Sequence, residues 1–587
     1  MAPKRRHLLS FAGAIFLFLI CLEGLNRRNN DAAHLQPFVP ASPSHPKPWP
    51  GEDTDGLGSP SSLPLPSEYS VAALSNTLES PSEFCTQRFG TRFLEAFSDC
   101  RASYCSGDSV SDLMCFHTAK PGTPVSESPD SFCLARNGLS FDVSRRKFLV
   151  NCGLRDPAPE RTSGCAVPYR NITSYGYLTG PKYILNEWMS VEKSPITTAS
   201  GVASRSSISP RNNYVLLLKR EVDGNIWHCM NEIMALMATF DVLRITREST
   251  AAGTALFSAD AVPRTEIVIL DDLPDGNYFD LFQMFTQSRP QRLDAWIAGR
   301  QVDKKTASIQ IRDNIIVPYA GAANSLWSDW KPIECTDNTM LRVFVQRIFD
   351  FYGIPRQRQR VDGGRIRVNI IVRKGSRQLM GLDTYLFAAV RDRFASLADV
   401  RLVDFEGMPF RAQVELARDS DVLVGMHGAG LTHTMFMEEG RGALVEIQPD
   451  RLCHWGFRNV AKMTGHAYFV AGARKIVGNC YPAPLGGGVE ILPDDGKGAP
   501  YDPSRCYIHT TDTTAWSLGC SDPKETGGDR SFWVCQNRDA NDDWYRTCKR
   551  KEAADIWWMT RYIMEQDRFV RLVGDAIEAF HQQNRTA

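Results

Sequence analysis

A strand that runs into a glycine-rich turn gives the strongest chemical signal in the sequence. Residues 421–433 read DVLVGMHGAGLTH, so an apolar strand is followed by small residues and then by a predicted helix. Gly428, Ala429 and Gly430 let the backbone approach a ligand closely, and free N–H groups at a helix start suit a diphosphate. His427 ends the strand, where it can donate to a phosphate or a ribose. The competing interpretation is a plain strand-to-helix turn in which His427 is structural.

Two other chemistries of this turn are disfavoured. The HGAG run at residues 427–430 also resembles the oxyanion loop of esterases, but the sequence contains no G-x-S-x-G nucleophile elbow. His427 and His433 lie six residues apart without carboxylates at a supporting spacing, which argues against a metal site. The phosphate-binding loop and the structural turn therefore stay as the two interpretations.

A basic pair follows a second predicted strand. Arg373 and Arg377 come after residues 366–372, an apolar and β-branched run. Ligands on parallel sheets bind at the carboxyl ends of strands, so both guanidinium groups are expected at the same sheet edge as His427. Guanidinium groups pair bidentately with phosphate oxygens and can stabilise a departing nucleoside diphosphate. The alternative is a solvated basic loop.

A third group opens an apolar helix at residues 224–232, which read GNIWHCMNE. His228 and Glu232 are four residues apart and therefore share one helix face. An imidazole and a carboxylate on one face can bind a sugar and act as a general base. A capped helix with a surface His–Glu pair is the alternative interpretation.

Carboxylates also follow two predicted strands. Glu446 comes after residues 443–445, and a carboxylate at a strand end can hold ribose hydroxyls; an ordinary loop acid is the alternative. Asp271 and Asp272 end the strand candidate at 266–270 and resemble acidic metal sites. Their spacing is not D-x-D, so a turn role is favoured over metal binding.

The elements that must position these groups alternate along the second half of the chain. Strands are predicted at residues 366–372, 400–405, 422–426, 443–447 and 466–470, and helices at 382–397, 410–418, 431–437 and 453–463. Such alternation predicts a parallel sheet with right-handed crossovers. A strand at 214–218 and a helix at 226–242 belong to an earlier mixed region, and a final helix is predicted at about 552–582.

Size and charge bound the class of protein. A chain of 587 residues is too long for one ordinary core, so two or three packed units are expected. Basic and acidic residues balance at 67 each, which gives a formal net charge of +0. Nucleic-acid binding usually leaves a basic excess, so nucleic acid is not expected as a partner.

The N-terminus indicates the secretory pathway. Cationic residues at positions 4–6 precede the apolar run 8–22, a pattern typical of a signal anchor or a cleaved signal peptide. The anchor is favoured because no clean small-x-small cleavage site follows. Residues 31–82 are rich in Pro, Ser and Gly and are predicted to form a flexible stem. We expect a single-pass type II protein of the endoplasmic reticulum or Golgi membrane, with its folded region in the lumen.

Cysteine usage agrees with an oxidising lumen. Fifteen of the sixteen cysteines lie beyond the apolar run, without a C-x-x-C pair, and they cluster towards both ends of the chain. They are expected to form disulfide frameworks, and because fifteen is odd at least one thiol stays free or pairs between chains. Cys229, in the apolar helix, is the candidate free and buried thiol. N-glycosylation patterns begin at Asn171 and Asn584.

Taken in order, these pieces resemble glycosyltransferase family 61, which includes EGF-domain-specific O-linked N-acetylglucosamine transferases. The resemblance covers about residues 224–470, under half of the chain. Its most specific part is the stretch 424–436, which is similar to V-G-x-H-G-A-x-L-T-x-x-x-F. Arg373 and Arg377 match a basic R-x-x-x-R that follows a strand in the family.

The helix start and the cysteine-rich region extend the resemblance. His228 matches the family's histidine in an N-x-x-H start, and Glu232 stands where the family commonly has Asp. Residues 132–137, FCLARN, look like a segment of fungal-type members. Glu232 is the expected general base, and the alternative is His228 as base with Glu232 orienting it.

The resemblance implies an inverting transferase with a GT-B arrangement. Two Rossmann-like lobes would face each other, with a UDP-sugar bound mainly on the C-terminal lobe through Arg373, Arg377, Glu446 and the turn at 427–430. UDP-N-acetylglucosamine is the first expected donor and UDP-xylose the second, and the acceptor is a hydroxyl of a luminal protein or glycan. No cofactor is required in this arrangement, and dependence on a divalent metal stays open. The rival class is a non-catalytic luminal carbohydrate- or nucleotide-binding protein that keeps the fold.

The predicted fold is therefore α/β and GT-B-like, with a disulfide-rich N-terminal region. Six segments are expected. They are a cytoplasmic tail and anchor (1–30), a stem (31–82), a cysteine-rich region (83–165), an N-terminal acceptor lobe (166–355), a C-terminal nucleotide-sugar-binding lobe (356–480) and a cysteine-containing extension with a final helix (481–587).

Overall fold

The computed structural model describes most of the chain up to residue 491, together with the C-terminal helix. The described residues are 63–74, 82–118, 130–157, 165–173, 178–193, 213–248, 253–327, 332–335, 338–355, 364–449, 452, 454–475, 480–482, 489–491 and 561–586. None of their helices is both long and apolar enough to cross a membrane. The predicted anchor at 1–30 and most of the extension after residue 491 lie outside the described residues.

Part of the predicted stem is folded. Helix α2 (Ser67–Leu74) lies inside the stretch that composition assigned to a stem. Its Tyr69 is buried and donates its hydroxyl to Asp241 Oδ2 at 2.6 Å. Arg347 pairs with the same carboxylate at 2.8 Å and with Glu68 at 2.8 Å. The prediction of a flexible stem is therefore wrong for this helix, because one aromatic side chain and one ion pair attach it to the folded region.

Seven strands of the described chain form the first sheet, in the order β1-β2-β3-β11-β7-β8-β9. They are β1 (Arg101–Ser103), β2 (Asp112–Thr118), β3 (Asp130–Arg136), β7 (Tyr214–Leu218), β8 (Thr265–Ile269), β9 (Gln291–Arg292) and β11 (Asn314–Val317). β11, β7, β8 and β9 run parallel, whereas β3 pairs antiparallel with both β2 and β11. Strands from the cysteine-rich region thus share a sheet with strands from later in the chain.

A layer of packed elements covers each face of this sheet, and the two layers together bury β7 on both faces. Leu216 and Leu218 belong to the same core as α6 (Ile226–Ile245), whereas Val215 and Leu217 belong to the core on the other face. That other face is covered by a small sheet in the order β10-β4-β5-β6 and by α5 and α7. Their bounds are β4 (Leu139–Asp142), β5 (Lys147–Asn151), β6 (Met189–Glu192), β10 (Ser308–Ile311), α5 (Pro181–Glu187) and α7 (Leu293–Ala298).

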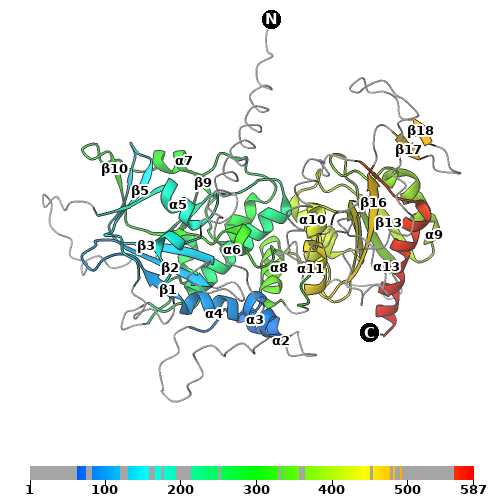
Figure 1. The fold of residues 1–587 in the computed structure, drawn as a ribbon, viewed down its shortest axis with the longest axis horizontal. Coiled ribbons are helices and arrows are strands. Elements are labelled where there is room, and N and C mark those ends of the chain that lie inside the picture. Colours follow the sequence, from blue (N-terminus) through cyan, green and yellow to red (C-terminus); the bar gives the residue numbers. More distant parts are fainter. Residues whose placement is uncertain are drawn as a thin grey trace, which may run out of the picture. The chain divides into compact units, whose positions relative to one another are not determined.

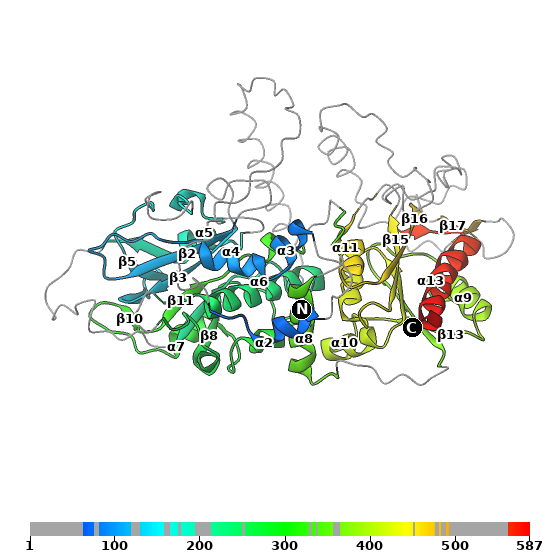
Figure 2. The same ribbon diagram turned by 90° about the horizontal axis from the view of Figure 1, so that it is seen from below.

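Shorter helices complete this part of the chain (Figures 1 and 2). They are α3 (Glu83–Phe89), α4 (Arg92–Asp99), α8 (Thr339–Tyr352) and the 3-10 helices η2 (Tyr169–Asn171), η3 (Ala259–Arg264), η4 (Phe279–Met284) and η5 (Gly321–Ala323). α3, α4 and α8 contribute to the core that α6 occupies, so α6 is surrounded by apolar side chains on almost every side. This explains why its sequence is apolar all round rather than amphipathic.

Six described strands form the second sheet, in the order β13-β12-β14-β15-β16-β19. They are β12 (Ile366–Ile371), β13 (Ala398–Val403), β14 (Val422–Met426), β15 (Ala443–Pro449), β16 (Ala467–Lys475) and β19 (Tyr562–Ile563). β12 to β16 run parallel, and β19 is antiparallel at the edge. The predicted parallel sheet is confirmed. Its strand order reverses between β12 and β14, which is where open parallel sheets bind ligands.

Helices cover both faces of the second sheet, so the α/β class is confirmed. α10 (Phe410–Arg418), α11 (Gly456–Met463) and the 3-10 helix η7 (Ala429–Phe436) belong to the core on one face. α9 (Phe387–Arg393) and α13 (Gln566–Thr586) belong to the core on the other. The figures show α13, in red, beside α9. β17 (Cys480–Pro482) and β18 (Val489–Ile491) form a separate hairpin-like pair.

Three predicted helices differ from the structure. Residues 382–397 were expected as one helix, but a π-helical turn (Leu382–Leu386) precedes α9. The helix expected at 431–437 is the 3-10 helix η7, which begins at Ala429 between two glycines that disfavour α-helical geometry. In the final segment, Tyr562 pairs with β16 as part of β19 and the helix α13 begins at Gln566, whereas the predicted helical residues 552–560 lie outside the described residues.

Disulfides fasten the N-terminal half of the described chain. The pairs are Cys85–Cys335, Cys100–Cys165, Cys105–Cys152 and Cys115–Cys133. The first joins positions 250 residues apart, and the others close loops inside the cysteine-rich region. The predicted N-terminal disulfide framework is confirmed, and Cys229 is free and buried as expected. The cysteines from 506 to 548 lie outside the described residues.

Candidate functional site

Gly428 and two arginines meet where the strand order reverses. Gly428 follows β14, and Arg373 and Arg377 follow β12, its parallel neighbour. Gly428 has a φ of 151°, a conformation that L side chains rarely adopt. A Cβ at this position would overlap Arg373 Nη1 and would lie 2.9 Å from Arg377 Nη2. The structure thus brings together the glycine turn and the basic pair that the sequence placed at one sheet edge.

The two guanidinium groups form a half-buried cationic site. Burial, and then the positive charge of Arg373, lower the pKa of Arg377 to about 10. Burial also lowers the pKa of Arg373, against an opposing effect of Glu406. Arg373 Nε donates to Ser376 O at 3.0 Å, which fixes the direction of this side chain. An anion between the two groups would relieve the repulsion between like charges, so the site suits a phosphate or carboxylate ligand.

His427 is held by a buried carboxylate. Its Nδ1 lies 2.6 Å from Glu446 Oε1, and Tyr468 donates its hydroxyl to Glu446 Oε2 at 2.6 Å. Glu446 is completely buried and His427 is 3% exposed. Glu446 lies inside β15, opposite Gly425 of β14, and not after the strand as expected. Both of its oxygens therefore have partners in the protein, and a ribose contact of Glu446 stays a prediction.

The surroundings of this pair are aromatic. The rings of His454 and Phe457 contact His427 at centroid distances of 4.5 and 5.3 Å. Burial raises the pKa of Glu446 to about 7, although the hydrogen bond from Tyr468 and the charge of His454 oppose the shift. Burial also raises the pKa of Tyr468 well above its usual range, and Glu446 adds to this effect. The hydrogen bond with Glu446 and the ring contacts with His454 and Phe457 therefore fix the orientation of His427.

His228 stands in the first turn of α6, which Asn225 caps. Its Nδ1 lies 2.6 Å from Glu221 Oε1, and its ring meets Trp327 edge to face at a centroid distance of 4.5 Å. Sequence reasoning missed Glu221, Trp327 and, on the second sheet, Tyr468. Glu221 follows β7, so its place at the carboxyl end of a parallel strand was the available signal.

Glu232 faces inward, towards the protein. It is 7% exposed, and a Cβ on Gly321 would lie 2.7 Å from its Cα, so the chain at Gly321 packs directly on this turn of α6. Burial raises the pKa of Glu232 well above its usual range, Asp271 adds to the shift and Arg220 opposes it. Glu232 was the residue expected to orient His228, but the hydrogen-bond partner of His228 Nδ1 is Glu221.

Asp271 has the turn role that its spacing favoured. It accepts from Arg220 Nη2 at 2.7 Å and from Leu273 N at 3.1 Å. Arg220 is 2% exposed and also donates to the carbonyls of Leu273 and Pro274. Within the described residues, no group of three or more His, Cys, Asp or Glu side chains is arranged to hold a metal ion. Asp271 therefore organises the loop after β8 together with a buried arginine.

Phe457 of α11 lies between the two groups of candidate residues. Its ring contacts His427 at a centroid distance of 5.3 Å and Trp227 at 5.5 Å. Trp227 directly precedes His228, so α11 connects the start of α6 to the end of β14. Residues that are about 200 positions apart in the sequence therefore belong to one neighbourhood.

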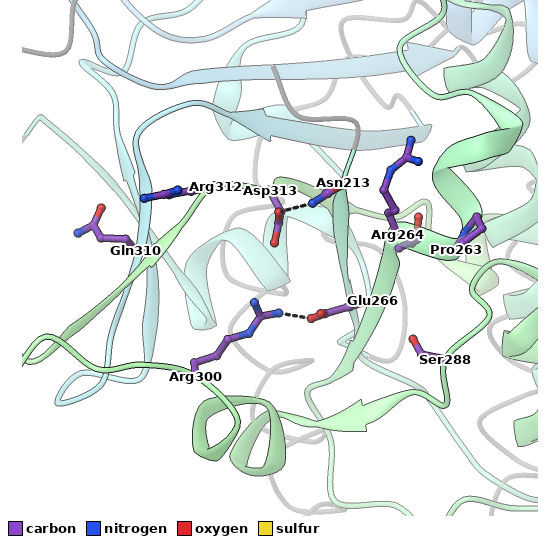
Figure 3. Close-up of a pocket in the computed structure, with 10 residues that line it drawn as sticks. Asn213, Pro263, Arg264, Glu266, Ser288, Arg300, Gln310, Arg312 and Asp313 are labelled. Atoms are coloured by element: carbon purple, nitrogen blue, oxygen red, sulfur yellow. Dashed lines mark hydrogen bonds and ion pairs between the residues drawn. The ribbon is translucent and has the colours of Figure 1, made fainter. Parts of the chain in front are cut away.

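A separate polar pocket of ≈ 490 Å³ lies at the amino ends of strands β7 and β8 in the first sheet (Figure 3). Its lining residues are Asn213, Pro263, Arg264, Thr265, Glu266, Ser288, Arg300, Gln310, Arg312 and Asp313. Asn213 donates to Asp313 at 3.2 Å, and Arg300 pairs with Glu266 (Figure 3). Asn213 and Arg264 precede β7 and β8, so this pocket is at the amino ends of the strands and does not belong to the site above.

Comparison with protein families gives the class of the central region. Residues 226–444 match the family model described as Glycosyltransferase 61. This region is therefore similar to glycosyltransferase family 61. It begins at the first residue of α6 and ends inside β15, so it contains His228, Arg373, Arg377 and the turn at 427–430. The resemblance inferred from the sequence is confirmed for this part of the chain.

Curated relatives agree with this class. An EGF domain-specific O-linked N-acetylglucosamine transferase of Drosophila melanogaster is 26% identical over 230 residues, which are 38% of this chain and 39% of the relative. Proteins of the same name from Bos taurus and Xenopus laevis are 29% and 30% identical over 107 and 109 residues. These two matches cover 18% of this chain and 20% of each relative. The chain thus spans about two fifths of the fly relative and about a fifth of the other two.

Proposed function

We propose that the protein is an inverting glycosyltransferase that moves a sugar from a UDP-sugar to a hydroxyl of a secretory-pathway protein or glycan. The observation that carries the proposal is the position of Gly428 beside Arg373 and Arg377, at the reversal point of a parallel sheet. UDP-N-acetylglucosamine is the first donor to test, because the relatives are named for N-acetylglucosamine transfer. UDP-xylose is the second.

The donor diphosphate would lie against the turn after β14. The missing Cβ of Gly428 lets two guanidinium groups approach the turn closely, and these groups would pair with phosphate oxygens. Backbone N–H groups at the start of η7, at Ala429 and Gly430, would face the charge that develops on the leaving diphosphate. His427 would donate from its second ring nitrogen. These groups can stabilise UDP as a leaving group without a metal ion.

The acceptor would approach from the first sheet. We propose that the second sheet is the donor lobe of a GT-B arrangement and that the first sheet, with α6, is the acceptor lobe. The contact of Phe457 with both His427 and Trp227 supports this, since it places the start of α6 near the donor side. The disulfides support an oxidising compartment, and we propose that residues 8–22 anchor the chain with its catalytic region in the lumen.

A donor and acceptor screen tests the proposal. The full chain, purified in detergent, would be incubated with a panel of UDP-sugars and a folded EGF-like domain, the acceptor named in the relatives. We expect transfer or slow hydrolysis of UDP-N-acetylglucosamine. Turnover of UDP-xylose alone would replace N-acetylglucosamine as the proposed donor sugar and would leave the proposed reaction class unchanged. UDP binding without turnover of any donor would favour the non-catalytic binding protein, and absence of UDP binding would overturn the donor site.

A further inference from the structure

We infer that Glu221 is a positioning residue that holds His228 as the general base of the transfer reaction. This inference rests on the proposed function for the reaction itself. The geometry of the Glu221–His228 pair stands independently of the donor. Neither the family resemblance nor the spacing of the sequence assigned Glu221 a role.

Two contacts fix the imidazole of His228. Glu221 Oε1 lies 2.6 Å from Nδ1, and the two side chains are only 12% and 21% exposed. Trp327 contacts the ring edge to face at a centroid distance of 4.5 Å. The histidine starts a helix that Asn225 caps, so its backbone is fixed as well. A ring held from both its polar and its apolar side has one preferred orientation.

The hydrogen bond also selects a tautomer. An ionised carboxylate only accepts, so Nδ1 of neutral His228 carries the proton and donates it to Glu221. The lone pair is then on Nε2, the nitrogen on the far side of the ring from Glu221. An imidazole whose Nδ1 donates to a carboxylate is the arrangement that prepares a general base, because the carboxylate stabilises the imidazolium that forms.

Glu232, the base expected from the sequence, is less suited to this task. Only 7% of Glu232 is exposed, and Gly321 packs against its backbone. Burial raises its pKa well above the usual range, which disfavours the charged carboxylate that a general base requires. His228 has the larger exposed fraction of the two and an oriented lone pair. The structure therefore moves the base role one helical turn towards the N-terminus of α6.

The acceptor hydroxyl oxygen forms a bond to the anomeric carbon of the donor while its proton passes to His228 Nε2. The bond between the anomeric carbon and the phosphate oxygen breaks, and its electron pair leaves with UDP, whose charge Arg373 and Arg377 stabilise. The resulting imidazolium keeps its Nδ1–H bond to Glu221 and then loses the Nε2 proton to solvent.

The tautomer can be tested without any substrate. The full chain would be labelled with ¹⁵N-histidine, and the signals of His228 would be identified by their loss in His228→Ala. We expect wild-type His228 to be protonated at Nδ1 at neutral pH, and Glu221→Gln to produce a mixture of tautomers. Protonation of wild-type His228 at Nε2 alone, or an unchanged tautomer in Glu221→Gln, would overturn the positioning role. This result does not depend on which sugar the protein transfers.

Turnover tests the base role. With UDP-N-acetylglucosamine and a folded EGF-like domain, His228→Ala should lower kcat by about 10²–10⁴-fold, and Glu221→Gln by roughly 10- to 100-fold. UDP affinity should be unchanged in both. If Glu221 acts through His228, the double variant should lose no more than His228→Ala alone. Losses that multiply in the double variant, or a Glu221→Gln enzyme within about twofold of wild type, would overturn the inference.

Two control variants separate the alternatives. Glu415→Gln removes an exposed carboxylate of α10 that pairs with Arg411, and it should leave kcat unchanged. Glu232→Gln compares the two candidate bases. A large loss in Glu232→Gln, with Glu221→Gln unaffected, would return the base role to Glu232. A wild-type protein that binds UDP but transfers nothing would remove the proposed function, and the tautomer experiment would still decide the role of Glu221.

Discussion

His427 Nδ1 lies 2.6 Å from Glu446 Oε1, and the pair joins the end of β14 to the middle of β15. Glu446 is completely buried, and its second oxygen accepts from Tyr468 at 2.6 Å. The arrangement makes the orientation of His427, a residue of the proposed donor site, depend on a carboxyl group whose burial raises its pKa to about 7. Stability should therefore depend on pH in the range where this group titrates.

The pH dependence has a definite sign. The pKa of Glu446 rises from 4.5 to about 7 on folding, so the folded state binds its proton more tightly than the unfolded state. Its contribution to stability is fully present below pH 4.5 and is lost as the pH rises through about 7, a loss of about 3 kcal/mol at most. Urea unfolding at a series of pH values would compare wild type with Glu446→Gln. As the pH rises through about 7, the free energy of unfolding of wild type should fall relative to that of Glu446→Gln. Parallel pH curves for the two proteins would contradict the raised pKa of Glu446.

Gly428→Ala tests the space beside the arginines. The added methyl would overlap Arg373 and strain a backbone with a φ of 151°, so UDP binding should weaken by at least about tenfold. Gly440→Ala is the matched control, because Gly440 also has a positive φ, of 75°, but a Cβ there would meet nothing within 4 Å. Both variants should lose about 1–2 kcal/mol of stability, measured by unfolding. Equal UDP affinities in the two variants would rule out the proposed phosphate position.

Tyr69→Phe tests the attachment of α2. The substitution removes a hydroxyl that donates to the buried Asp241 at 2.6 Å, so the free energy of unfolding should fall by about 1–3 kcal/mol. Tyr183→Phe is a suitable control, because its ring contact with Trp188 would stay. Chemical unfolding measures both variants. A Tyr69→Phe protein as stable as the control would show that this end of the predicted stem adds nothing to the fold.

The second sheet could be predicted well because its strands are short apolar runs separated by amphipathic helices. The bounds of β14 and α10, for example, follow directly from the apolar run at 422–426 and the helical spacing at 410–418. The convergence of Arg373, Arg377 and Gly428 followed from the rule that ligand groups gather at the carboxyl ends of parallel strands.

The partners of the two histidines could not be predicted in the same way. Glu221 reaches His228 because the loop after β7 is held by the buried Arg220–Asp271 pair, and spacing gives no sign of that loop conformation. Cys85 pairs with Cys335 across 250 residues, and connectivity among many cysteines does not follow from their spacing. The burial of Glu232 could not be predicted either, because the chain at Gly321, a distant part of the sequence, packs against this turn of α6.

UDP affinity of the arginine variants tests the central claim most directly. Isothermal titration of the full chain with UDP would compare wild type with Arg373→Ala, Arg377→Ala and Arg411→Ala, the last an exposed arginine of α10 that pairs with Glu415. Each charge-assisted phosphate contact is worth about 1.5–3 kcal/mol. We predict that Arg373→Ala and Arg377→Ala bind UDP at least about tenfold more weakly than wild type and that Arg411→Ala binds it equally well. Folded Arg373→Ala and Arg377→Ala proteins with wild-type UDP affinity would contradict the account.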